Sequence, residues 1–260
     1  HCIIFPSMLR AHGGYILPKN VPANEFLNLE GEKISTSKNW AVWIHEYLED
    51  FPDKQDVMRY VLVANMPETK DSDFTWKDFQ AKNNNELVAI YGNYVNRVIV
   101  LINKYYMGEV PTPEILTKED EKTIKSIKLA RDKIGLTIEK FRFRESNSEM
   151  INIARIGNKY LADNEPWKKI KNEPERTKTI LFVSIQIVSA LAYLSEPFLP
   201  FTSLKLKGIL RINEQIKWNE ILNNNIIKSG HQINGGSFLF EKIEDGEIYS
   251  QYQKLEKTKK

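Results

Sequence analysis

Apolar side chains recur every three or four positions along most of this chain, a spacing that places them on one face of a helix. The pattern predicts helices over residues 57–64, 76–107, 146–162 and 175–195, with another after residue 117 and a short one at 204–210. Because neighbouring amphipathic helices with short connections pack antiparallel, we expect the chain from residue 76 onward to form a helical bundle.

Residues 175–195 are apolar nearly all round, which is typical of a helix at the centre of a bundle. Ser184, Gln186 and Ser189 interrupt this segment before it reaches the ~18 apolar residues that suggest a membrane span. We therefore expect a buried helix and no membrane anchor.

The beginning of the chain has a different pattern, with short apolar runs among glycines and prolines. Phe26, Leu27 and Leu29 predict a short strand that enters a polar, flexible loop at residues 31–38. The apolar opening resembles the inside of a folded element, so we expect the chain to belong to a longer protein. Arg10 and His12 follow that opening closely, which argues against a signal peptide.

The composition is that of a globular protein, with 42% hydrophobic and 27% charged residues among 260. The net charge of +3 is too balanced to indicate nucleic-acid binding by itself, although local clusters could provide it. The single cysteine, Cys2, excludes an internal disulfide framework and a cysteine-based zinc site, and it fits a reducing compartment. The basic tail at 254–260 is expected to fray.

The loop at 31–38 is a candidate phosphate-binding site. Its ammonium groups supply positive charge and its hydroxyls supply hydrogen bonds, and a mobile loop can close over a polyphosphate. The residues concerned are Lys33, Ser35, Ser37 and Lys38. The alternative is an ordinary solvated loop.

One face of the helix at 76–107 is a candidate RNA contact. Asn93, Asn96, Arg97 and Lys104 lie on that face at helical spacing. Carboxamide and guanidinium groups can hydrogen-bond to the edges of unpaired bases. The alternative is a solvated polar face.

Pro166 and Trp167 form a second candidate contact, because an aromatic ring beside lysines can stack on a base while the lysines bind phosphate. The alternative is a core tryptophan. Pro166 also disfavours helical backbone at Glu165, so we expect an extended residue there.

Two further groups are interpreted as structural. A basic stretch is expected to be a solvated face, with phosphate contact as the second choice: Arg131, Lys140, Arg142 and Arg144. Three tryptophans are expected in the core: Trp40, Trp43 and Trp76.

Four features, in the family's order along the chain, resemble class I aminoacyl-tRNA synthetases and methionyl-tRNA synthetases in particular: a loop, the pair of segments that flank it and two motifs of a helical bundle. FLNLEGEKISTSKNW at 26–40 resembles the second signature loop, usually KMSKS. HCIIFPSML at 1–9 and DVMRYVL at 56–62 resemble its flanks, GNYVNR at 92–97 resembles the opening of the anticodon-binding bundle, and PW at 166–167 resembles a further motif of that bundle. The resemblance extends to about residue 210.

The resemblance implies a mainly α fold, in which the helical anticodon-binding bundle is preceded by the C-terminal remnant of a Rossmann-type α/β catalytic domain. The expected divisions are 1–75 for the end of the catalytic domain with its connecting region, 76–225 for the bundle and 226–260 for a C-terminal extension or linker. The implied activity is that of a cytoplasmic methionine–tRNA ligase, which joins methionine to tRNA(Met) through methionyl-adenylate with ATP and Mg²⁺.

Site roles are also implied by the resemblance. Lys33, Ser35 and Ser37 would stabilise pyrophosphate, with Lys38 supplying charge because Thr36 stands where the signature loop has its second lysine. His1 and Phe5 would line the methionine pocket. Asn96, Pro166 and Trp167 would contact the anticodon, although Val100 departs from relatives that have Asn one turn along.

The first signature motif, HIGH, and the zinc-bearing insertion of the family do not occur in this sequence, and its four histidines form no such pair. We therefore expect no metal or cofactor to be bound by this chain alone, zinc only in the missing N-terminal part, and no activation of methionine by the chain by itself. The resemblance leaves room for a homodimer formed through regions beyond Lys260. Three alternatives stay open: a leucine, isoleucine or valine synthetase, a non-catalytic RNA-binding module, and a helical scaffold for protein partners.

Overall fold

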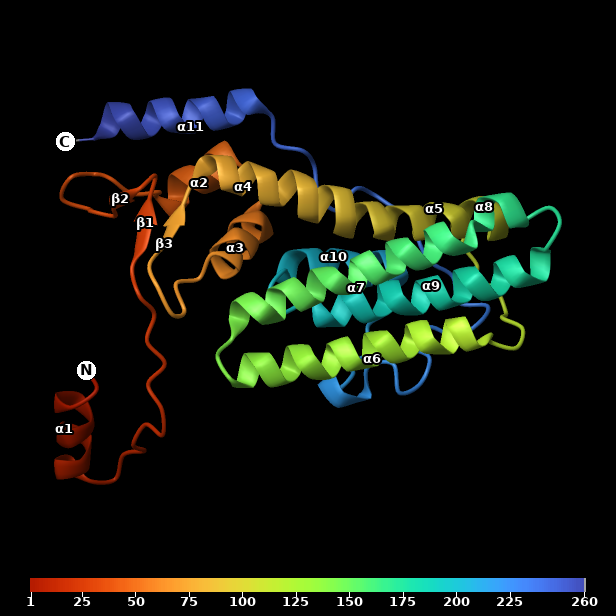
Figure 1. Ribbon diagram of the computed structural model, residues 1–260, viewed down its shortest axis with the longest axis horizontal. Coiled ribbons are helices and arrows are strands. Elements are labelled where there is room, and N and C mark those ends of the chain that lie inside the picture. Colours follow the sequence, from red (N-terminus) through yellow and green to blue (C-terminus); the bar gives the residue numbers. More distant parts are fainter. Residues whose placement is uncertain (260) are drawn as a thin grey trace.

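The computed structural model describes residues 1–259, which form a small α/β part and a long helical bundle (Figure 1). The α/β part comprises α1 (Ile4–His12), β1 (Leu27–Leu29), β2 (Glu32–Lys33), α2 (Ile44–Asp50), α3 (Gln55–Ala64) and β3 (Ser72–Phe74). From there the chain continues through α4 (Trp76–Lys82), the π-helical η1 (Asn83–Gly92), α5 (Asn93–Tyr106), α6 (Lys118–Glu139), α7 (Phe143–Asn164), α8 (Pro166–Lys169), α9 (Pro174–Leu194), α10 (Pro200–Leu210), the short 3-10 helix η2 (Trp218–Glu220) and α11 (Asp245–Thr258). The expected mainly α fold is confirmed.

The sheet has the strand order β2-β1-β3. β1 runs antiparallel to β2, with Asn28 opposite Lys33, and parallel to β3, with Asn28 opposite Asp73. The strand predicted from the apolar run before Gly31 is therefore confirmed. The two other strands contain only two and three residues, too few for their alternation to stand out in the sequence.

The long helix expected at 76–107 is confirmed in extent, but its middle third is the π-helix η1. Two carboxamide side chains of this segment bind the C-terminal part of the chain. Asn83 is fully buried and donates from Nδ2 to the carbonyl of Glu241 at 2.9 Å. Asn84 both donates to the carbonyl of Ile243 and accepts from its N–H, each at 2.9 Å. This segment is therefore where the C-terminal part of the chain is fastened.

α9 is the central helix of the bundle, as its apolar circumference predicts. It is long and apolar enough to cross a membrane by composition, but 94% of the qualifying window is buried inside the protein. α5, α6, α7 and α10 pack against it. This arrangement is typical of a core helix.

Four local expectations are wrong. The tail does not fray at 254, because α11 continues to Thr258 after a capping box formed by Glu244 and Glu247. Glu165 is not extended but left-handed, with φ of 43°. Arg131 is buried rather than solvated, and its guanidinium donates to the carbonyls of residues 219 and 221, so it holds the loop after α10. Trp40 and Trp76 are buried in the core as expected, whereas Trp43 is only half-buried and lies outside it, so the expectation for Trp43 is wrong.

A buried ion pair joins three helices of the bundle at Asp120. Its carboxylate accepts hydrogen bonds from Arg176 at 2.5 and 2.9 Å, from the Tyr160 hydroxyl at 2.5 Å and from the N–H of Thr117 at 2.9 Å. Burial raises the pKa of Asp120, but these hydrogen bonds outweigh it and lower the pKa to about 2. The charged form is therefore the one that stabilises the fold.

Replacement of the Asp120 carboxylate should make the free energy of unfolding depend less on pH in the acidic range. Because the folded pKa lies below the usual 3.8, the contribution of Asp120 is fully present above about pH 4 and is lost as the pH falls toward 2. We expect Asp120→Asn to lower the free energy of unfolding by about 3 kcal/mol at pH 7, because Arg176 is left without its partner. Urea unfolding at pH 7, 5, 4 and 3 checks this, and equal stability of the two proteins at pH 7 would contradict it.

Candidate nucleic-acid interface and signature loop

The signature loop, residues 31–38, is an exposed turn whose polar groups face one another. The hydroxyls of Ser35 and Ser37 lie 3.1 Å apart, and the N–H of Lys38 donates to the Ser35 hydroxyl at 3.4 Å. The Lys33 ammonium lies 5.5 Å from the centre of the Phe26 ring. Lys33, Thr36, Ser37 and Lys38 are exposed. The structure thus brings the predicted phosphate-binding groups together on one loop.

The base of the loop is rigidly attached to the sheet. The Asp73 carboxylate accepts the N–H of Gly31 with both oxygens at 3.0 Å. Ser35 and Trp40 exchange backbone hydrogen bonds, each at 2.9 Å, and the buried indole of Trp40 donates to the carbonyl of Leu29 at 2.9 Å. Only the tip of the loop is therefore left to move around a ligand.

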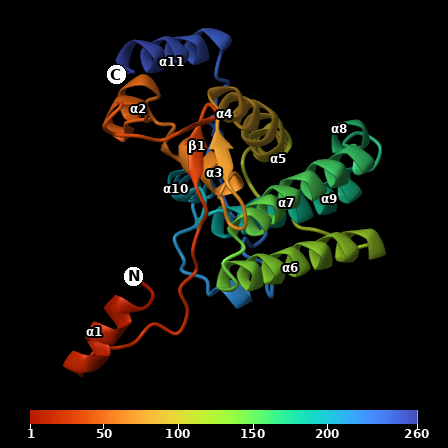
Figure 2. The ribbon, with the colours of Figure 1, turned by 60° about the vertical axis from the view of Figure 1, so that its left-hand side comes forward.

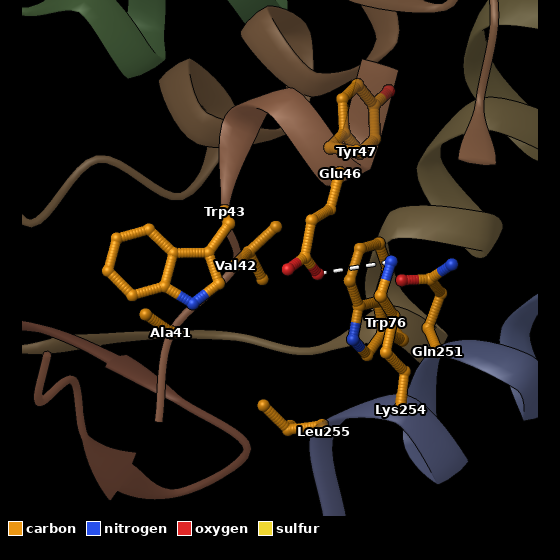
Figure 3. A pocket seen from close by; sticks show the side chains of 9 residues that line it. All are labelled: Ala41, Val42, Trp43, Glu46, Tyr47, Trp76, Gln251, Lys254 and Leu255. Carbon is orange, nitrogen blue, oxygen red and sulfur yellow. Dashed lines mark ion pairs between the residues drawn. The ribbon is translucent and has the colours of Figure 1, made fainter. Parts of the chain in front are cut away.

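The C-terminal helix reaches this loop from the far end of the chain. The ammonium of Lys259 lies 2.7 Å from a Glu32 carboxylate oxygen and 4.2 Å from the centre of the Trp40 ring. Figure 3 shows the small pocket beside this contact, where α11 lies across α2 and α4 and Lys254 pairs with Glu46. Residues at opposite ends of the sequence thus meet beside the signature loop.

The expected methionine-pocket residues are not brought to the loop. His1 is exposed and Phe5 is 56% exposed. Both belong to the segment that starts α1, which has no buried residue and stands away from the rest of the protein in both views (Figures 1 and 2). Their role in binding methionine stays a prediction.

The polar face of α5 is exposed or half-buried over its whole length, with Asn93 and Lys104 exposed and Asn96 and Arg97 half-buried. Among these residues, Arg97 reaches the neighbouring helices α7 and α8. Its guanidinium lies 5.0 Å from the centre of the Trp167 ring and 3.5 Å from the Asn158 side-chain oxygen. Two residues that sequence analysis singled out 70 positions apart are therefore in direct contact.

Trp167 is held at this place by the junction of α7 and α8. Glu165 reverses the chain through its left-handed backbone, and Pro166 is buried as the first residue of α8. Trp167 itself is half-buried, so one part of the ring packs on the bundle and the rest is accessible. Trp167 is neither a fully buried core residue nor a free surface side chain.

Sequence analysis missed a second aromatic residue near the same face. The segment at 235–242 crosses α5 on its way to α11, and Phe238 and Lys242 line a cleft of about 320 Å³ together with Asn93 and Asn96. Phe238 is 70% exposed. The short apolar run around Phe238 looks like an ordinary loop in sequence, because nothing local indicates that it returns to α5.

The described part of the chain contains no group of three or more His, Cys, Asp or Glu side chains that could hold a metal ion.

Comparisons with known proteins agree with this arrangement. The family model for class I tRNA synthetases (M) matches residues 1–99, and that for the anticodon-binding domain of methionyl-tRNA ligase matches residues 110–260. Methionine–tRNA ligases of Christiangramia forsetii and Flavobacterium psychrophilum are 62% and 60% identical to the whole of this chain. The chain spans 38% of the length of each of these relatives.

Solved structures are similar in fold. The free methionyl-tRNA synthetase of Mycobacterium tuberculosis superposes with a TM-score of 0.81 at 20% identity, covering 93% of this chain and 47% of that one. The same enzyme in complex with methionyl-adenylate also superposes with a TM-score of 0.81, at 22% identity, covering 92% of this chain and 47% of that one.

The end of an α/β domain with its signature loop, followed by a helical anticodon-binding bundle, defines the class as that of the class I aminoacyl-tRNA synthetases. Within this class, the match of the anticodon-domain model to more than half of the residues places the chain more narrowly. The chain belongs to the methionyl-tRNA ligase family.

Loss of the ion pairs that Lys254 makes should loosen the contact between α11 and the α/β part. The Lys254 ammonium lies 3.1 Å from Glu46 and 2.9 Å from Asp50. Lys254→Ala should lower the free energy of unfolding by no more than about 1 kcal/mol, because these pairs are partly exposed. Amide exchange in α11 should nevertheless become faster, which hydrogen-exchange mass spectrometry measures. Lys257→Ala, at an exposed position of the same helix, is the matched control, and equal exchange in both variants would refute the tether.

Proposed function

We propose that this chain is the part of a methionine–tRNA ligase that holds the signature loop and reads the anticodon of tRNA(Met). The ligase would join methionine to tRNA(Met) in the cytoplasm, using ATP with Mg²⁺. In this proposal, residues 1–75 provide the end of the catalytic domain, residues 76–225 the anticodon-binding bundle and residues 226–260 the extension that returns to the loop. The relatives of the same name and the two matching family models support this assignment.

The single observation that carries the RNA-binding part is the contact between Arg97 and Trp167 at 5.0 Å. Unpaired bases are bound by stacking on aromatic rings or guanidinium planes and by hydrogen bonds to their edges. The half-buried indole of Trp167 offers a stacking surface, and the guanidinium of Arg97 beside it offers hydrogen-bond donors. Asn96, the residue before Arg97 on α5, adds a carboxamide. Pro166 fixes the turn that presents the ring, while Asn93 and Lys104 extend the polar face toward the neighbouring nucleotides.

The signature loop would act on ATP. Methionine's carboxylate attacks the α-phosphorus, a new C–O–P bond forms, and the bond to pyrophosphate breaks. The ammonium groups of Lys33 and Lys38 and the hydroxyls of Ser35 and Ser37 would hold the charge that develops on pyrophosphate. Thr36 lacks the positive charge that the usual loop has at this position, so Lys38 takes a larger share.

Anticodon reading is tested by titrating the chain with the anticodon stem-loop of tRNA(Met) and with a stem-loop whose anticodon is changed. We expect the wild-type chain to prefer the first RNA. Trp167→Ala should weaken its binding by about 5- to 100-fold, because base stacking is worth ~1–3 kcal/mol. Tryptophan fluorescence or filter binding provides the dissociation constants at one fixed salt concentration.

Trp43→Ala is the control for this titration, since Trp43 is also half-buried but lies in the α/β part beside α2. It should bind both RNAs like the wild-type chain. Equal affinity of the wild-type chain for the two stem-loops would refute anticodon reading, and the scaffold alternative would then be favoured.

A further inference from the structure

The two residues of β2 point to opposite faces of the small sheet, because successive side chains of a strand alternate. Lys33 lies opposite Asn28 of β1. Phe26, two positions before Asn28, shares the face of Asn28 and is therefore a diagonal neighbour of Lys33, within reach of a long side chain. The Lys33 ammonium accordingly lies 5.5 Å from the centre of the Phe26 ring. This distance is within the ~6 Å at which an ammonium group is attracted to the face of an aromatic ring.

The Phe26 ring is exposed although its backbone is fixed. The N–H of Phe26 donates to the Asp71 carboxylate at 3.0 Å, and its carbonyl accepts the N–H of Ser72 at 2.9 Å. Both partners lie at the start of β3, on the other side of β1 from β2. The ring itself is 62% exposed. The sheet thus holds a large apolar side chain in water beside the first lysine of the loop, where the ring forgoes the free energy of burial.

The carboxylates near Lys33 are occupied by other partners. Glu32, its neighbour in sequence, is on the other face of β2 and pairs with the Lys259 ammonium at 2.7 Å. Asp73 shares the sheet face of Lys33 through the pairing of β1 with β2 and β3, but its two oxygens accept the N–H of Gly31 at 3.0 Å. In the part of the chain that the structure describes, the Lys33 ammonium makes no ion pair. The charge of Lys33 is therefore not neutralised within the protein.

An aromatic ring holds an ammonium group without cancelling its charge. A carboxylate would neutralise Lys33 and would compete with phosphate oxygens for its three N–H donors. The ring attracts the ammonium group electrostatically, and the donors that point away from the ring stay available. Holding the side chain also reduces the conformational entropy that a freely rotating lysine would lose on binding a ligand. The arrangement thus provides a charged group that is ordered and still unpaired.

We propose that Phe26 is a positioning residue for Lys33, and that its ring keeps the ammonium group ordered and unpaired for pyrophosphate. This inference rests on the proposed function, in which Lys33 binds pyrophosphate, and adds a residue that acts only through Lys33. Phe26 contributes no group to the ligand itself. Its effect on the affinity for pyrophosphate therefore depends on the charge at position 33.

A double-mutant cycle tests this dependence. Inorganic pyrophosphate is titrated at one fixed salt concentration into the wild-type chain, Phe26→Leu, Lys33→Met and the variant with both substitutions, and calorimetry or NMR provides the dissociation constants. We expect Lys33→Met to weaken binding, and Phe26→Leu to weaken it by about 2- to 5-fold, as loss of a cation–π contact at an exposed site would. In the Lys33→Met background, Phe26→Leu should change nothing. Phe26→Tyr should retain the wild-type affinity because it keeps the ring.

The contact itself has an NMR signature, because protons above an aromatic ring resonate upfield. The side-chain methylene signals of Lys33 should lie upfield of those of Lys38 in the wild-type chain, and this difference should disappear in Phe26→Leu. Phe201→Leu is the matched control, since Phe201 is also exposed, at 58%, but lies on α10. It should leave both the signals and the affinity unchanged.

Three results would overturn the positioning role alone, provided that Lys33→Met weakens binding. They are wild-type affinity of Phe26→Leu, an equal loss from Phe26→Leu with and without Lys33, and Lys33 signals that show no upfield shift. Pyrophosphate affinity that is unchanged by Lys33→Met would overturn the proposed role of the signature loop together with the inference.

Discussion

The contact between Tyr94 and Gly157 sets the spacing on which the bundle depends. A Cβ on Gly157 would lie 2.2 Å from Tyr94 Cζ, so α5 can approach α7 this closely only because position 157 has no side chain. The Tyr94 hydroxyl then passes between the helices and donates to the carbonyl of Ser184 in α9 at 3.1 Å. Burial raises the pKa of this hydroxyl, so it stays a neutral donor. The Tyr94 side chain thus connects α5, α7 and α9. Because Arg97 is one turn beyond Tyr94 and Asn158 follows Gly157, the same contact fixes the place where Arg97 meets Trp167.

The π-helix η1 joins this bundle to the rest of the chain. Its carbonyl at Ile90 accepts a hydrogen bond from Asn158 at 3.0 Å, and Asn84 pairs with Ile243 on the opposite side. The segment therefore fastens α7 and the returning chain to one continuous helix, which begins with Trp76 under α11 and ends with the polar face of α5. The signature loop lies near one end of this element, where the N–H of Trp76 donates to Glu30, and the polar face of α5 lies at the other end.

Much of this architecture could be predicted from the sequence. The apolar periodicity located the long helices to within a few residues, and four ordered motifs indicated the family. What the sequence could not indicate were contacts between distant segments. The tail at 254–260 has a single apolar residue, Leu255, which is too little to predict a helix. α11 is held by the burial of Ile248 and Leu255 as well as by the ion pairs from Lys254 to α2. Phe238 was missed for the same reason, because its importance arises from the path of the backbone across α5. Arg131 looked like part of a basic surface, but its guanidinium satisfies carbonyls that lie about 90 positions further along the chain.

The return of the chain has a consequence for how the two candidate sites can communicate. The segment at 236–242 forms one wall of the cleft beside Asn96, and the helix that follows it, α11, reaches Glu32 and Trp40 at the signature loop. The returning segment is fixed at Asn84 and continues directly into α11. Lys254 and Gln251 hold α11 on Asp50. Continuous, packed elements are one means by which energetic coupling is carried between distant sites. In this protein two such elements run side by side, the helix from Trp76 to Tyr106 and the returning chain with α11, and they are joined at η1.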